Sequence, residues 1–515
     1  MPYVPATFDR VVNQVFTRDL GIRACNLILA SAVLAGTVRA QHTALGQASP
    51  QSGTRIENDQ RIVIDSEGVS ALKQDIGKQL RDMFTHIGNQ SRRRLVLFIH
   101  GGLTTLEQAN TNAKNRGPVI RGDDHNAYPI FLNWEAGLVS SYGRHLAYER
   151  NGISYRGTPS AWSAIAITPF VLLSDVGRGV ANLSMNTALN FGKVLENNDH
   201  LYESRPRSFV TKNKFLETLR EFSPNPATSQ ADDRFFHSGL IYRVRPGGPP
   251  FDLFLGPDIT KVNVGEFALG SATVPLQLAT EPILDTVGTS AWKNMLRRTR
   301  TMFFPAENFI TTTEPANQAG LTEGAAYQFF CQLDSFLKTH PDYYLDVIAH
   351  SVGAIVMNEA YRNFPDLRVR NLVYMAAACT IRDFLVGPAE HLNTYHTEFY
   401  NLCLHPRNEI DETNEFGIPV RGSLLTWIDE FFESPASFGD RTLGSLQNAV
   451  IGYRLLPKSE HIHLKAFAVN KSEKDYPKGF SAGPQKHGDF GNFEFWKAIY
   501  WRTDVPLQQY YRKLP

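Results

Sequence analysis

The sequence predicts an α/β protein with a doubly wound, mostly parallel sheet and a large insertion. The strand-like run 94–99 is apolar without interruption from Leu95 to Ile99, which is typical of a central strand with helices above and below it. Strand-like runs alternate with segments of helical spacing, which indicates a parallel sheet. A His-Gly-Gly triplet at 100–102, Ser351, and the residues after His405 each follow such a run, where ligands bind in parallel sheets.

Composition places the chain among ordinary globular proteins. Of its 515 residues, 42% are apolar and 20% are charged, and the formal net charge is +1. The chain lacks the excess of positive charge that is typical of a nucleic-acid-binding protein, so we expect no nucleic-acid partner. The four cysteines, Cys25, Cys331, Cys379 and Cys403, show no metal-ligand spacing. We therefore expect no metal site, no cofactor and no disulfide framework.

Residues 1–40 have the pattern of a secretory signal. Arg10, Arg18 and Arg23 precede an apolar run at 24–36, and small residues follow it. The segment is expected to be cleaved or retained as an anchor, and the alternative is an ordinary N-terminal helix. We expect an exported or membrane-associated protein, or a cytoplasmic one if the alternative holds. Residues 41–60 are polar and rich in Gly, Ser and Gln, which predicts a linker.

The core of the fold is expected in two parts of the chain, 61–150 and 320–515. The predicted strands are 61–65, 94–99, 128–135, 344–348, 369–378, 398–405 and 461–469. The predicted helices are 69–87, one beginning near 140, 323–337, 352–361 and 493–501. The triplet Arg92–Arg94 is expected to lie at a solvated edge of the sheet.

Residues 151–319 interrupt this alternation and predict an insertion that covers the site as a cap. Within it, 241–244 and 251–254 indicate a pair of strands resembling a hairpin. The segment 281–300 has helical spacing and is expected to turn Arg298 outward.

Residues 157–174, within the insertion, carry no charge. Pro159 and Pro169 and the short apolar reach argue against a membrane-spanning helix. The segment is expected either to be buried against the core or to form an apolar lip that faces the pocket or a lipid surface. The second alternative allows association with a membrane surface.

Ser351 lies in a pattern that is typical of a nucleophile elbow. A β run at 344–348 precedes it and a helical pattern at 352–361 follows it. Such a corner needs small residues two places before and two places after the nucleophile. Ala349 and Gly353 fill these places, and alanine adds only a methyl group to the usual glycine.

A serine hydroxyl needs a base that takes its proton. His487 follows the last strand and is the expected base. His461 and His463 lie at the wrong end of that strand, and His350 is expected to point away from the site.

The oxyanion formed by attack on a carbonyl needs backbone donors. We expect the N–H of Val352 as one donor and the N–H of Gly102 or Leu103 as the other. The alternative is that the His-Gly-Gly triplet is only a tight exit from its strand.

A carboxylate must orient the base, and it is expected in the loop after His405. Glu409 and Asp411 are both within reach, and Asp383 is a third candidate. The order serine, acid, histidine along the chain is the order that this type of elbow shows.

Three motifs together resemble the α/β-hydrolase superfamily, on its lipase and esterase side: Ile99–Gly102, Ala349–Gly353 and His487–Phe490. The resemblance covers about 61–150 and 320–505. It implies an α/β-hydrolase fold and a serine hydrolase that cleaves a small-molecule or lipid ester through a Ser-His-acid triad and an acyl-enzyme. The alanine in the elbow and the lack of a lone Asp in the acid loop depart from the family pattern.

Two alternatives stay open. The same triad serves an amidase, a thioesterase or an acyltransferase, because all share the acyl-enzyme. A member of another class would be a non-catalytic protein of hydrolase fold that binds a partner or a membrane through the insertion.

Overall fold

The computed structural model divides into two compact units, Met1–Thr54 and Arg55–Pro515. The described residues all belong to the second unit: 60–66, 68–71, 76–147, 149–150, 153–154, 167–181, 242–244, 252–255, 287–305, 323–405, 408–409, 412, 422–433, 437–452, 461–467, 469, 476–502 and 510–514. The expected signal segment 1–40 and residues 41–59 of the expected linker lie outside them.

A nine-stranded sheet forms the centre of the second unit, in the order β1-β3-β2-β8-β9-β10-β11-β7-β6. Its strands are β1 (Arg61–Ile64), β2 (Arg94–Ile99), β3 (Ala127–Trp134), β6 (Tyr242–Val244), β7 (Asp252–Leu255), β8 (Tyr344–His350), β9 (Asn371–Met375), β10 (Glu398–Cys403) and β11 (Ile462–Ala466). All neighbours pair in parallel except β6 and β7. The predicted α/β fold with a mostly parallel sheet is confirmed.

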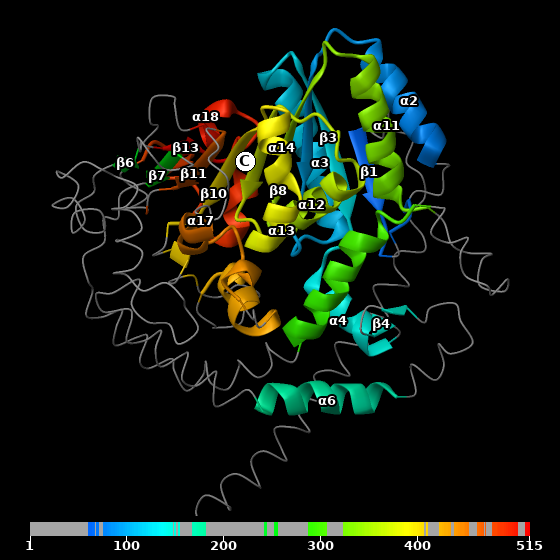
Figure 1. Cartoon of the computed structure of the whole chain (residues 1–515), viewed down its shortest axis with the longest axis vertical. Coiled ribbons are helices and arrows are strands. Elements are labelled where there is room, and N and C mark those ends of the chain that lie inside the picture. The colour runs from blue at the N-terminus through cyan, green and yellow to red at the C-terminus, as the bar shows by residue number, and fades with distance from the viewer. Residues whose placement is uncertain are drawn as a thin grey trace, which may run out of the picture. The chain divides into compact units, whose positions relative to one another are not determined.

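Helices flank the sheet (Figure 1). The numbered helices are α2 (Ile76–Gly88), α3 (Leu106–Asp123), α4 (Leu138–Ala147), α6 (Thr168–Ala181), α11 (Ala325–Thr339), α12 (Gly353–Asn363), α13 (Ile381–Val386), α14 (Pro388–Thr394), α16 (Leu424–Trp427), α17 (Leu446–Gly452) and α18 (Ala498–Trp501). Of these, α6 lies apart from the sheet and contacts α4. Shorter elements are the small sheets β4 (Glu149–Arg150) with β5 (Ile153–Ser154) and β12 (Phe480–Ser481) with β13 (Tyr511–Arg512). The π-helix η5 (Ile428–Phe432) and the 3-10 helices η6 (Phe438–Asp440) and η9 (His487–Asn492) are also short.

The order of the strands reverses direction between β2 and β8. From β2 the chain moves through α3 to β3 on one side, and from β8 it moves through α12 to β9 on the other. Because such crossovers are right-handed, α3 and α12 must cover opposite faces of the sheet. The carboxyl ends of β2 and β8 therefore border a crevice at the point where ligands bind in open α/β sheets.

Helix α3 had no counterpart among the predicted elements. Its apolar positions form only a narrow stripe, and Pro118 lies inside it. The helix begins with a capping box, in which the Thr105 hydroxyl accepts the Gln108 N–H at 3.2 Å and the Gln108 side chain accepts the Thr105 N–H at 3.1 Å. A Thr followed three residues later by Gln was thus the signal that marks its start.

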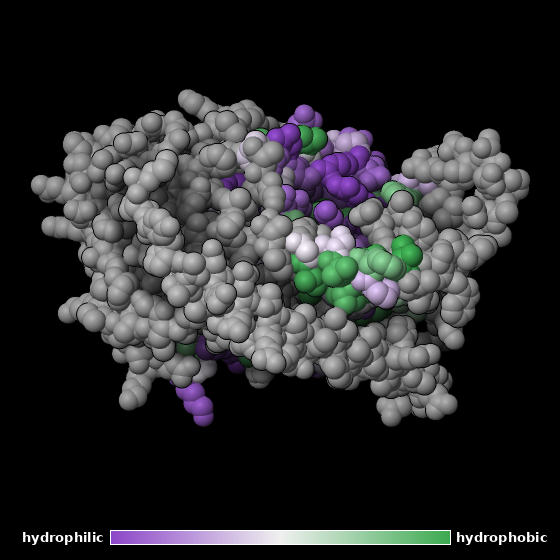
Figure 2. Space-filling model, turned by 90° about the horizontal axis from the view of Figure 1, so that it is seen from below, coloured by the Kyte–Doolittle hydropathy of each residue, from purple (hydrophilic) through white to green (hydrophobic). Residues whose placement is uncertain are grey.

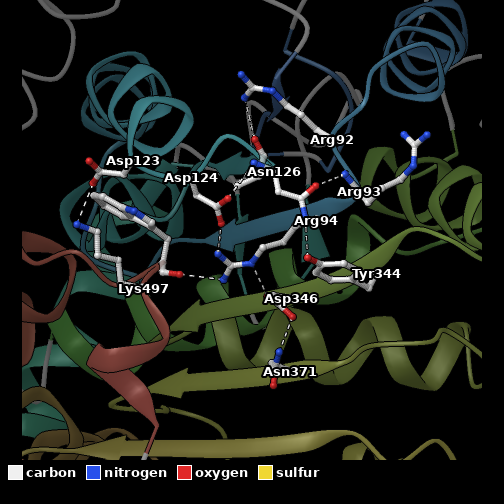
Figure 3. A network of polar contacts seen from close by, with 12 residues as sticks. Arg92, Arg93, Arg94, Asp123, Asp124, Asn126, Tyr344, Asp346, Asn371 and Lys497 are labelled. Carbon is white, nitrogen blue, oxygen red and sulfur yellow. Dashed lines mark hydrogen bonds and ion pairs between the residues drawn. The ribbon is translucent and has the colours of Figure 1, made fainter. Parts of the chain in front are cut away.

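The amino ends of β2 and β8 are joined by a buried network of ions (Figure 3). Arg94 donates to Asp346 at 2.7 Å, to Asp124 at 2.8 Å and to the carbonyl of Trp496 at 2.9 Å. Asp346 is fully buried and also accepts from Arg370. The expectation of a solvated edge is wrong for Arg94, which is 9% exposed, because these acceptors replace the water that it loses.

Two described parts of residues 151–319 belong to the core itself: the strands β6 and β7, and a helix at 287–301. The hairpin of β6 and β7 is present, and β7 pairs with β11 to extend the central sheet. The helix at 287–301 packs on the core, but Arg298 is 1% exposed rather than turned outward. Its guanidinium donates to the Ser141 hydroxyl at 2.8 Å and to the Glu135 carbonyl at 3.1 Å, which satisfies the buried charge with fixed acceptors.

Helix α6 carries an apolar surface. Phe170 is 72% exposed and Leu173 is 70% exposed, with Ile167 half-exposed beside them. Figure 2, which views the molecule from below, shows apolar side chains gathered on this face. These residues of the 157–174 segment are therefore not buried against the core. Among the described helices, none is both long and apolar enough to cross a membrane.

The predicted helix at 493–501 is shorter than expected, because only α18 (Ala498–Trp501) is helical. Phe493 instead pairs with Lys513 as an isolated bridge. The extended backbone lets the Phe495 ring stack on Phe98 of β2, with the ring centroids 4.5 Å apart. The C-terminal segment is thereby fixed beside the carboxyl end of β2.

Candidate active site

Ser351 occupies a one-residue corner between β8 and α12. Its φ of 52° lies in the left-handed region, which residues with a side chain rarely adopt. Three backbone hydrogen bonds hold the corner: the Ser351 N–H donates to the Met375 carbonyl at 2.8 Å, and the Ser351 carbonyl accepts the N–H groups of Ala354 and Ala378, each at 3.1 Å. The strand, corner and helix expected from the sequence are present.

The exit from β2 lies directly against this corner. A Cβ atom at Gly353 would be 2.5 Å from the Ile99 carbonyl oxygen, and one at Gly101 would be 2.9 Å from the Ser351 Cβ. Both distances are shorter than real carbon contacts, so a larger residue at either place would push the strand exit and the corner apart. The small residues of the two motifs are explained by this close approach.

The side chain of His487 contacts Ser351. Its Nε2 lies 2.8 Å from the Ser351 Oγ, and both side chains are 1% exposed. The loop before His487 is fixed by Asp489, whose carboxylate accepts the N–H groups of Gln485 and Lys486 at 3.2 and 3.0 Å. Residues 136 positions apart in the sequence thus form the hydrogen bond that a serine nucleophile needs.

His350 does not point away from the site, so that expectation is wrong. Its Nε2 donates to the carbonyl of His487 at 3.0 Å, and the two rings lie 5.4 Å apart. The strand period of two explains the error, because His350 follows Ile348 and Asp346 onto the face that His487 covers. The side chain next to Ser351 therefore holds the backbone of His487.

Burial keeps the histidines of the site neutral. It lowers the pKa of His487 well below its usual value, and the neighbouring His350 lowers it further. Burial also lowers the pKa of His350 to about 4. A neutral His487 can accept a proton from Ser351 near neutral pH, as a general base must.

His100 shapes the turn that follows β2. Its Nε2 accepts the Trp134 N–H at 3.1 Å, and its Nδ1 then carries the proton and donates to the Gly101 carbonyl at 2.9 Å. Burial lowers the pKa of His100 to about 4, so this neutral tautomer persists at physiological pH. These two hydrogen bonds fix the turn that leads into Gly102, next to the Ser351 corner.

The expected oxyanion donors belong to two segments that pack together, the turn after β2 and the start of α12. Gly102 packs against Val352, since a Cβ there would be 2.5 Å from the Val352 Cγ2. Within the described part of the chain, the N–H groups of Gly102, Leu103 and Val352 donate to no other residue. Unpaired amides at the start of a helix and beside a tight turn suit a developing negative charge.

The expected acids lie in different places. Asp411 lies outside the described residues. Glu409 is buried, and its Oε1 accepts from the Ser423 hydroxyl at 2.6 Å. Asp383 accepts from Asn358 and pairs with an arginine of α12, away from His487.

Glu412 contacts His487 and was not among the expected acids. Its carboxylate oxygens accept the backbone N–H of His487 at 3.1 and 3.0 Å. The Nδ1 of His487 is buried, and none of the described residues forms a hydrogen bond with it. The sequence signal was the acid-rich loop 409–412, but position in a loop does not tell which carboxylate turns inward.

A cavity of about 420 Å³ opens beside Ser351 and His487. Phe98 and Phe131 of the sheet line it on one side, and the α3 residues Ala113 and Arg116 line it on another. Its volume is within the range for small-molecule sites. In the described ranges, no cluster of three or more His, Cys, Asp or Glu side chains could hold a metal ion.

No family model, no curated protein and no solved structure matches the chain.

Proposed function

We propose that the protein is a serine hydrolase of α/β-hydrolase fold that cleaves a carboxylic ester. The observation that carries the proposal is the 2.8 Å hydrogen bond between the Ser351 Oγ and the Nε2 of a neutral, buried His487. A strained corner with positive φ presents this serine at the end of a central strand. Both features are costly to maintain, and nucleophilic attack explains both.

The proposed reaction has two halves. Ser351 attacks the ester carbonyl while His487 takes its proton, and the oxyanion that forms is bound by the amides of Val352 and of Gly102 or Leu103. His487 then gives the proton to the departing alcohol, which leaves the acyl group on Ser351. Water repeats the sequence and releases the carboxylic acid.

Glu412 is the proposed third member of the triad. Its carboxylate already accepts the backbone N–H of His487, which brings a negative charge to the base. A rotation of this side chain toward Nδ1 would fix the tautomer that leaves Nε2 free to accept the serine proton. Glu409 and Asp411 remain the competing candidates.

A non-catalytic binding protein is the second candidate. The observation that favours it is the Nδ1 of His487, which has no hydrogen-bond partner within the described residues. A histidine without an orienting acid is a weaker base. The two candidates differ in whether Ser351 is activated.

Labelling with a fluorophosphonate decides between them, because this probe reports an activated serine whatever the substrate. The native chain should be labelled, Ser351→Ala should not be, and Ser335→Ala on the exposed face of α11 should be labelled like the native chain. A native chain that stays unlabelled would favour the binding protein. Label that persists in Ser351→Ala would show that the nucleophile lies elsewhere.

A further inference from the structure

Arg116 brings a positive charge to the cavity that contains Ser351 and His487. It lies on α3, where its guanidinium faces the Phe495 ring at 5.6 Å from the centroid. A Cβ at Gly491 would be 3.4 Å from Nη1 of Arg116, so the guanidinium also lies beside the turn that follows His487. The cation and the catalytic base are thus held by the same short segment, residues 487–491.

The surroundings of Arg116 do not neutralise it. Within the described ranges, no carboxylate forms an ion pair with its guanidinium. His100, His350 and His487 also line the cavity, and burial keeps all three neutral. Burial lowers the pKa of Arg116 to about 10, so it stays charged at neutral pH while it lacks full hydration.

Glu107 is the carboxylate that lines the same cavity. It is exposed in the first turn of α3 and lies nine positions before Arg116. At a rise of 1.5 Å per residue, the two positions are roughly 13 Å apart along the helix. The negative charge therefore stands at the solvent side of the cavity and the positive charge farther along it.

We propose that Arg116 binds an anionic group of the substrate, a carboxylate or a phosphate, while Ser351 attacks the ester bond of the same molecule. This inference rests on the proposed function and names its substrate class. A planar guanidinium suits both anions, because it donates two parallel hydrogen bonds to a pair of oxygens. The phenylalanine side chains of the cavity would contact the apolar part that links the anion to the ester.

Paired substrates that differ in one charge test the inference. The p-nitrophenyl monoester of glutaric acid carries a carboxylate on the acyl side, and p-nitrophenyl pentanoate is its neutral counterpart. The pair m-acetoxybenzoate and m-acetoxytoluene places the charge on the leaving group, and p-acetoxyphenyl phosphate replaces the carboxylate by a phosphate. The native enzyme should prefer the charged member of at least one pair in kcat/KM.

Arg116→Gln should reduce that preference by roughly 10- to 100-fold, because a hydrogen-bonded charge is lost from a partly dehydrated site. Arg116→Lys keeps the charge but loses the paired donors, and should lie between. Arg121→Gln, on the same helix but outside the cavity, should keep the native preference. An equal preference in the native enzyme and Arg116→Gln would overturn the inference.

A direct measurement separates this inference from the proposed function. Glutarate and inorganic phosphate are titrated by calorimetry into Ser351→Ala, which keeps the cavity but lacks the nucleophile. Binding that weakens when Arg116→Gln is added supports the anion site, even if fluorophosphonate labelling refutes the hydrolase. Normal labelling together with no binding of either anion overturns the anion site and leaves the hydrolase standing.

Discussion

The two ends of β2 and β8 carry equally buried polar groups that are arranged in opposite ways. At the amino ends, Arg94 and Asp346 bond to each other and to further fixed partners (Figure 3). At the carboxyl ends, Ser351 lies beside the neutral His487, whose Nδ1 has no hydrogen-bond partner in the described part of the chain. The same two strands thus begin at polar groups that are paired with one another and end beside polar groups whose hydrogen bonds are incomplete.

The difference teaches that burial alone does not mark a functional site. Burial would lower the pKa of Arg94, but Asp346 and Asp124 offset that effect, and the pKa is raised overall. For His487, burial lowers the pKa and no described carboxylate bonds to the ring. Polar groups whose hydrogen bonds are all made within the protein stabilise the fold, whereas groups with unpaired donors or acceptors are available to bind a ligand.

The largest expected effect separates the two ends by activity. His487→Ala should reduce kcat by about 10⁴- to 10⁶-fold, because Ser351 loses its proposed base. Asp346→Asn, at the other end of the strand, should leave the kcat of the folded fraction within a few-fold of native. Ester hydrolysis measured at equal folded concentration checks both, and a comparable loss of kcat in the two variants would contradict the comparison.

The next effect concerns the acid. Glu412→Gln should reduce kcat by about 10²- to 10⁴-fold, since the base loses the charge that stabilises its protonated form. Glu409→Gln and Asp411→Asn are the matched controls and should each retain most of the activity. If one of these controls loses activity and Glu412→Gln does not, that residue is the acid instead.

A substitution in the ion network at the amino ends of β2 and β8 should lower the stability of the fold. Asp346→Asn removes the charge that Arg94 and Arg370 share, and leaves the partly exposed Asp124 as the one described carboxylate paired with Arg94. The free energy of unfolding should fall by about 3–5 kcal/mol, the usual result of breaking a buried ion pair. Urea unfolding measures it, and a loss below about 1 kcal/mol would show that the network is not a main support of the sheet.

A smaller effect depends on pH. His100 has a folded pKa of about 4, whereas an unfolded histidine has about 6.5. Between these values the unfolded chain binds the proton more readily, so stability is complete above about pH 6.5 and is lost as the pH falls toward 4. His100 should contribute about 2 kcal/mol of loss between pH 7.5 and 5.

His100→Gln keeps a donor and an acceptor but cannot titrate, so its unfolding midpoint in urea should change less over this range. An unchanged pH profile in the variant would mean that His100 does not carry the effect. The pKa of His487 is lowered in the same direction. The activity should therefore fall on the acid side of the pH profile with a midpoint below pH 6.5.

The smallest effect lies outside both ends, on α6. Phe170 is 72% exposed, so Phe170→Asp should change the free energy of unfolding by less than about 0.5 kcal/mol. If α6 is an apolar lip, activity on long-chain esters should fall more than activity on acetate esters. Equal loss on both, with a lowered melting temperature, would remove the lipid-facing role.

The strands and the elbow were predictable because they depend on local patterns. The apolar run Leu95–Ile99 marks β2, the β run 344–348 marks β8, and a serine between small residues marks the corner. The partners of these elements were not predictable in the same way. Nothing in the sequence distinguishes Arg94 from a solvated arginine, and Arg116 lies on a helix with a weak hydrophobic pattern. The roles of both residues follow only from their spatial neighbours in the sheet and in the cavity.

The pairing of β2 with β8 also has a consequence for biosynthesis. These neighbours are separated by roughly 245 residues, from Ile99 to Tyr344. At about 5–20 residues per second, a ribosome needs on the order of 12–50 s to deliver the second strand. Throughout this interval β2 can pair with β3 on one side only, and its other edge stays an open template of apolar residues. We therefore expect the nascent chain to be open to pairing with other chains at this edge until β8 is made.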